Sequence, residues 1–118
     1  MKKKPRPEVM LGLTEKVELM CGNLYVTVNY DEEGEPFEVF IQLGKAGGCG
    51  YSQLEGLARM ISLAMRSGVS VDEITEQLKG IRCPTVSYAN GKQFLSCADA
   101  VAMVLREMGA RHKAGSTH

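Results

Sequence analysis

The stretch Leu43–Leu54, LGKAGGCGYSQL, joins a strand-like segment to a long amphipathic helix through a glycine-rich loop, and the remaining elements lie on either side of it. Four of the residues over 44–50 are glycine. This composition is typical of a backbone that needs positive φ angles or that closely approaches a ligand or a neighbouring segment. Lys45 and Cys49 are the only reactive side chains of the loop.

The loop has two interpretations. Ser52 followed by Glu55 predicts a capping box, so the loop N–H groups and the positive end of a helix dipole would meet at one place. This would make a nucleotide or small-anion site, for which the candidate residues are Gly44, Lys45, Gly47, Gly48 and Arg82. The alternative is a tight strand-to-helix connection, because neither GxxxxGK[ST] nor GxGxxG spacing is present.

Composition indicates one globular domain over residues 11–109, between a basic flexible arm at 1–10 and a flexible tail at 110–118. The 14 Lys and Arg residues balance the 14 Asp and Glu residues, so nucleic acid and anionic membranes are not favoured as partners. The sequence contains neither a signal-peptide core nor an apolar run of membrane-spanning length. We therefore expect a cytoplasmic protein.

Alternating apolar residues predict three strands, at Thr14–Met20, Leu24–Tyr30 and Phe37–Leu43. The turns between them are Cys21–Asn23 and the acidic Asp31–Pro36. Short turns of this kind join antiparallel neighbours. The sequence thus predicts a three-stranded antiparallel meander.

Three helices are expected, over Ser52–Ser67, Val71–Lys79 and Cys97–Met108. The buried stripe expected on the first helix is Leu54, Leu57, Ile61 and Ala64. Capping residues predict where the other two begin, namely Ser70 with Glu73 and Ser96 with Asp99. The pair Asn90-Gly91 marks a small extra hairpin between them. The predicted class is α+β, a meander packed against about three helices.

Each of the four cysteines lies at an expected element boundary; they are Cys21, Cys49, Cys83 and Cys97. In the cytoplasm they would be reduced, which leaves three interpretations: ligands of a metal, a thiol redox pair, or small apolar residues packed where elements meet. No CxxC pair is present, so a zinc site would have to gather four separate turns. The only histidines, His112 and His118, lie in the tail, which argues against a cysteine nucleophile.

With these residues in view, the chain resembles the TSCPD domain, found near the carboxyl end of many adenosylcobalamin-dependent (class II) ribonucleotide reductases and as free-standing small proteins. The segments that carry the resemblance are Arg6–Val9, CGNLYVTVN (Cys21–Asn29), Pro36–Phe40, LGKAGGC (Leu43–Cys49), Leu57–Ser67, QLKGIRCP (Gln77–Pro84) and LSCADA (Leu95–Ala100). In the last of these, Leu95 and Ala98 stand where the motif that names the family has threonine and proline.

The resemblance implies cysteine at all four positions and a structural zinc ion held by Cys21, Cys49, Cys83 and Cys97. It also implies an accessory or interaction module of a ribonucleoside-diphosphate reductase, whose catalytic barrel this chain lacks. We therefore expect neither catalysis nor adenosylcobalamin binding by this chain alone. The expected partner is a reductase catalytic subunit or a second copy of the chain.

Overall fold

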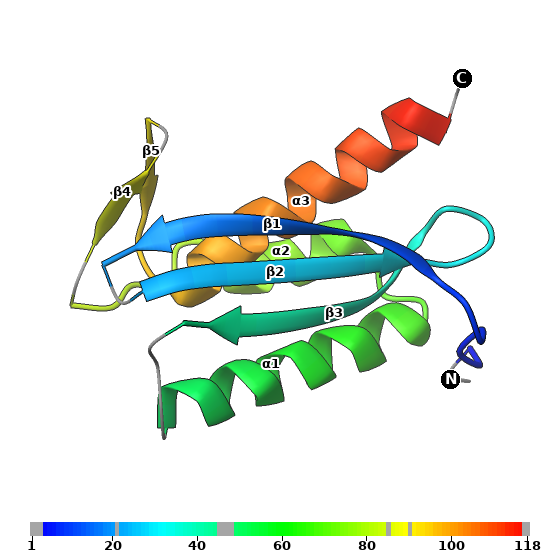
Figure 1. Ribbon diagram of the computed structural model, residues 1–118, viewed down its shortest axis with the longest axis horizontal. Helices are drawn as coiled ribbons and strands as arrows, with labels where there is room; N and C mark the ends of the chain where they lie inside the picture. The colour runs from blue at the N-terminus through cyan, green and yellow to red at the C-terminus, as the bar shows by residue number, and fades with distance from the viewer. Residues whose placement is uncertain (1–3, 21, 45–48, 85, 90, 117–118) are drawn as a thin grey trace.

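The computed structural model describes residues 4–20, 22–44, 49–84, 86–89 and 91–116, of which residues 49–51 and 110–116 are described by their backbone alone. Three antiparallel strands form a sheet in the order β1-β2-β3; they are β1 (Leu11–Leu19), β2 (Gly22–Tyr30) and β3 (Pro36–Leu43) (Figure 1). The rest of the fold comprises α1 (Cys49–Arg66), α2 (Val71–Leu78), a hairpin of β4 (Ser87–Ala89) and β5 (Lys92–Phe94), and α3 (Cys97–Ser116). The predicted α+β class, with its meander and extra hairpin, is confirmed.

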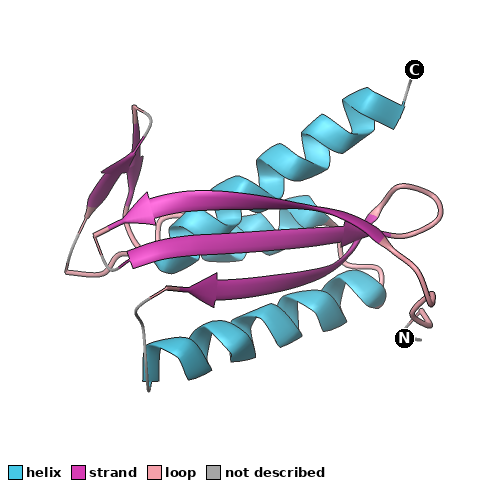
Figure 2. Ribbon diagram, viewed as in Figure 1, coloured by secondary structure: helices cyan, strands magenta, loops and turns pink. Residues whose placement is uncertain are grey.

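The helices are arranged around one face and one edge of the sheet. Figure 2 shows α2 and α3 behind the strands and α1 running along β3. The core lies between these layers. Its strand side is the predicted alternating row Leu24, Val26 and Val28, all fully buried, and its helix side includes Val101 and Leu105. No helix in the described ranges is both long and apolar enough to cross a membrane.

Helix α1 runs along the outer edge of β3 and bonds one residue of that edge through a single side chain. The Ser62 Oγ accepts a hydrogen bond from the Val39 N–H at 2.9 Å and donates one to the Val39 carbonyl at 3.2 Å. An edge strand normally leaves such groups for water or for another chain. Here one serine satisfies both groups of the strand residue.

Two of the four residues predicted to form the buried stripe of α1 are buried in the structure. The buried residues are Leu54, Ala58, Ile61 and Met65, whereas Leu57 and Ala64 are only half-buried. The helix is rotated toward the edge strand that it covers, so Leu57 and Ala64 line cavities beside α2. Because α1 begins at Cys49, Ser52 lies in its first turn, and the predicted capping position is wrong by one turn.

Helix α3 is longer than predicted. It runs to Ser116, whereas the sequence predicts its end at Met108, because glycine is common just after the last residue of a helix. Gly109 instead lies within the helix where α3 passes α2, and a Cβ atom there would be 3.8 Å from Val71 Cγ1. That distance is ordinary van der Waals contact, so packing does not require glycine at this position, and the alanine and basic residues after it suit a helical end.

Candidate functional site

The ends of several elements converge at one end of the molecule, where β3 stops and α1 and α3 begin (Figure 1). The β1–β2 turn lies there too, because Leu24 pairs with Leu43 and the Gly44 N–H donates to the Asn23 carbonyl at 2.8 Å. Gly22 has φ +136°, and a Cβ atom on it would be 2.4 Å from the Gly44 carbonyl oxygen. Glycine at 22 therefore allows the β1–β2 turn to touch the start of the glycine-rich loop.

A cavity of about 750 Å³ opens at this end, between α1 and the segment that joins α2 to α3. Its lining is mostly apolar and includes Leu43, Leu54, Leu57, Met60, Leu78, Ile81, Arg82, Cys83, Ser96, Cys97 and Ala98. The cavity is thus built from the three segments in which Cys49, Cys83 and Cys97 occur.

Two of the predicted ligands, Cys83 and Cys97, line this cavity together, and both are half-buried. The Cys83 N–H donates to the Leu95 carbonyl at 2.9 Å, which ties its segment to the residues before α3. Cys97 is the first residue of α3. The structure therefore brings this pair to one site.

Cys21 and the Cys49 side chain lie outside the described residues, as do Lys45, Gly47 and Gly48 of the predicted anion site. Their neighbours are described: Gly22 follows Cys21, and α1 begins at Cys49. Within the described part of the chain no group of three or more His, Cys, Asp and Glu side chains could hold a metal. The four-cysteine site therefore remains a prediction.

A buried carboxylate holds the cysteine-bearing segments in place. Asp99 is only 3% exposed, and its two oxygens accept hydrogen bonds from the Gly80 N–H at 2.9 Å and the Leu95 N–H at 3.0 Å. Beside it, the Ser96 Oγ accepts from the Asp99 N–H and donates to the Ile81 carbonyl at 2.6 Å. The predicted Ser96 cap is confirmed, and it also fixes the approach to Cys83.

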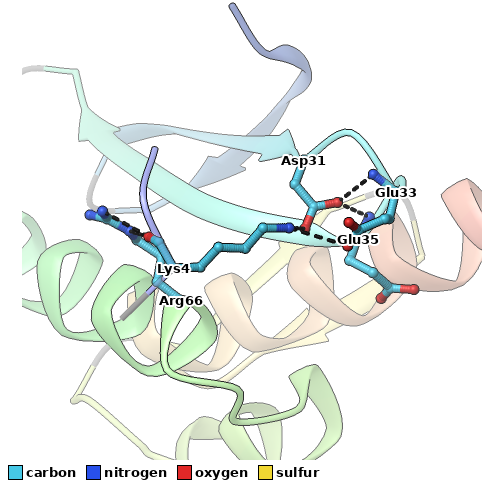
Figure 3. Close-up of polar contacts among 5 residues, drawn as sticks. All are labelled: Lys4, Asp31, Glu33, Glu35 and Arg66. Atoms are coloured by element: carbon cyan, nitrogen blue, oxygen red, sulfur yellow. Dashed lines mark hydrogen bonds and ion pairs between the residues drawn. The ribbon is translucent and has the colours of Figure 1, made fainter. Parts of the chain in front are cut away.

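The N-terminal arm forms a second polar cluster, at the opposite end of the sheet (Figure 3). Lys4 Nζ lies 2.8 Å from Asp31 Oδ2 and 3.2 Å from Glu33 Oε2. The Lys4 backbone N–H donates to the Arg66 carbonyl, and the Arg66 guanidinium donates back to the Lys4 carbonyl. The same guanidinium stacks 5.1 Å from the centre of the Phe37 ring. The arm is therefore attached to the turn between β2 and β3 and to α1.

Electrostatics in this cluster favour ionised carboxylates. Burial raises the pKa of Asp31, but the Lys4 ammonium and the N–H groups of Glu35 and Glu33 outweigh it and hold that pKa below its ordinary value. Burial likewise raises the pKa of Glu38, while hydrogen bonds from Arg6 and Asn29 lower it by more. Glu38 is only 6% exposed, because Arg6 of the arm covers it. The basic composition of the arm does not predict which carboxylates its side chains contact.

A family model for the TSCPD domain matches residues 1–109. The chain belongs to the TSCPD family. Among characterised relatives, the chain is 24% identical over 119 aligned residues to the vitamin B12-dependent ribonucleotide reductase of Rhodopirellula baltica. That alignment covers 98% of this TSCPD chain but 11% of the reductase. No solved structure matches the chain.

Proposed function

We propose that this TSCPD chain is an accessory module of a B12-dependent ribonucleotide reductase, acting beside a catalytic subunit in the cytoplasm without reducing ribonucleotides on its own. The observation that carries the proposal is the similarity of nearly the whole chain to a segment that makes up 11% of such a reductase. The remaining length of that enzyme has no counterpart in this sequence. We therefore propose that the chain acts through binding to the catalytic subunit.

The experiment combines the purified chain with a reductase of this class from which its own TSCPD segment has been deleted. We expect the two proteins to co-elute on size exclusion and the added chain to change the rate of ribonucleotide reduction. The chain alone, given adenosylcobalamin, substrate and reductant, should show no turnover. Turnover by the lone chain, or failure to bind the truncated reductase, would contradict the proposal.

Within this module we propose a structural zinc ion held by the thiolates of Cys21, Cys49, Cys83 and Cys97. Support comes from Cys83 and Cys97, which line one cavity, and from the glycine contact that brings the neighbour of Cys21 to the same end of the sheet. Four sulfur ligands are a typical tetrahedral zinc set. When bound, the ion would cross-link the hairpin turn, the loop and two helix starts, and so contribute to folding.

A further inference from the structure

The two edges of the three-stranded sheet differ in what covers them. The edge at β3 is covered by α1, through the pair of hydrogen bonds between Ser62 and Val39. At the other edge, β1 extends over nine residues and, in the described part of the chain, pairs only with β2. A long open edge of this kind is a template for pairing with a further strand.

The direction of the free groups on β1 follows from the register. The Val39 N–H and C=O point to α1, away from β2, so the groups of its partner Val28 point toward β1. Leu13 pairs with Val28 and is therefore hydrogen-bonded to β2. By alternation, the outward N–H and C=O groups belong to Gly12, Thr14, Lys16 and Glu18. The next residue in this alternation, Met20, donates its N–H outward to Ser87 Oγ at 2.8 Å, as this assignment requires.

Apolar side chains accompany this open backbone. Leu11 and Leu13 lie on the same face of β1 as the buried Val17, yet they are 81% and 44% exposed. Val9, just before the strand, is 82% exposed. Within the described residues, the helices cover this face of β1 near Val17 and leave the leucine end bare. An open strand edge and an uncovered apolar row thus occur together.

We infer that a second copy of this chain occupies the edge, with the two β1 strands antiparallel about a two-fold axis at Thr14. In this register Leu11 lies opposite the partner's Val17, and Gly12 lies opposite the partner's Lys16. The outward groups of Thr14 face those of the partner's Thr14, as a hydrogen-bonded pair requires. The arrangement uses the same patch on both chains, which is the commonest symmetry of homodimers.

Charge favours this register over those centred on Glu15 and Lys16. An axis at Glu15 would place two glutamates directly opposite, and an axis at Lys16 would do the same with two lysines; like charges at such positions are destabilising. The axis at Thr14 leaves neither charge facing its own copy. It also retains apolar pairs on both sides of the axis. An axis at Leu13 would also avoid facing like charges within β1, but it would pair a shorter part of the strand. The register centred on Thr14 therefore joins more of β1 without placing a charge opposite its own copy.

The test is sedimentation equilibrium of the full chain in reducing buffer, across a range of concentrations, for the wild type, Lys16→Pro and Lys16→Ala. The Lys16 N–H points away from β2, so proline leaves the β1–β2 hydrogen bonds intact while removing a donor to the partner. We expect a dimer for the wild type and for Lys16→Ala. For Lys16→Pro we expect weaker association, with the Kd of the dimer raised about tenfold or more.

The inference would be overturned if the wild type remains monomeric. It would also be overturned if the dimer Kd of Lys16→Pro equals that of Lys16→Ala. Circular dichroism establishes whether Lys16→Pro is folded. If it is not, Leu11→Lys replaces it, because Leu11 is 81% exposed and its substitution spares the core. A folded Leu11→Lys chain should then be monomeric where the wild type is a dimer, and an undiminished dimer would equally overturn the inference.

Discussion

The Asp99 carboxylate accepts a hydrogen bond from the Gly80 N–H, 2.9 Å away, although the two residues are 19 positions apart. This contact joins the end of α2 to the first turn of α3, on either side of the segment that carries Cys83. Gly80 has φ +82°, a conformation that glycine adopts at little cost. The position of the cysteines thus depends on a buried acid that is itself not a proposed ligand.

Replacing Asp99 with alanine should strongly destabilise the protein. The substitution leaves the N–H groups of Gly80 and Leu95 without their charged acceptor, and each such bond contributes about 1.5–3 kcal/mol. Urea denaturation measures the loss. The control is Asp72→Ala, which changes an exposed acid in the first turn of α2. Equal effects of the two variants would show that Asp99 has only a helix-dipole role.

Two glycine-to-alanine variants should change stability in opposite directions. A Cβ atom on Gly12 would lie 2.9 Å from the Val28 carbonyl and 1.9 Å from Asn29 Oδ1, so Gly12→Ala must displace backbone and destabilise the sheet. Gly56 is in the interior of α1 with nothing within 4 Å of such an atom. Gly56→Ala should stabilise the helix by about 0.5–1 kcal/mol. Thermal melts of both variants give the signs, and a stabilised Gly12→Ala chain would contradict the packing described for Asn29.

Stability should fall in acid, in part through Glu38. The folded-state pKa of Glu38 lies below its ordinary value of 4.5, so the unfolded chain takes up the proton first as the pH drops. The contribution is therefore complete well above pH 4.5 and is lost as the pH falls through the folded-state pKa. Chemical denaturation at a series of pH values measures this. Glu38→Gln should flatten the acid limb, whereas Glu32→Gln, in the β2–β3 turn, should leave it steep.

Metal content tests the cysteine cluster. We expect elemental analysis of the purified chain to give about one zinc per chain, and chelation to lower its melting temperature. Cys97→Ser should lose the metal and the response to chelator. The control Ala98→Ser changes a neighbouring residue of the same cavity lining without removing a thiol. Wild-type protein that is free of metal and indifferent to chelator would exclude the site.

Local patterns predicted the parts of the fold that local physics determines. The alternation of Leu24, Val26 and Val28 identified the central strand and its buried face, and Ser96 with Asp99 identified the start of α3. The burial of Glu38 could not be predicted from local spacing, because its cover, Arg6, is 32 residues away in sequence. The link from Asp99 to Gly80 was missed for the same reason. The spacing of side chains predicts the local secondary structure. These contacts instead depend on how segments that are distant in sequence pack together.

The contact between Ser62 and Val39 also limits how far any assembly of this chain can grow. A sheet with two open margins can accept a neighbour on each side and so polymerise without end. Here the serine blocks one margin, so strand pairing can proceed only through the other. Once that margin is occupied, the remaining edge of the three-stranded sheet has α1 beside it, so pairing through this sheet would stop at two chains instead of extending into fibrils.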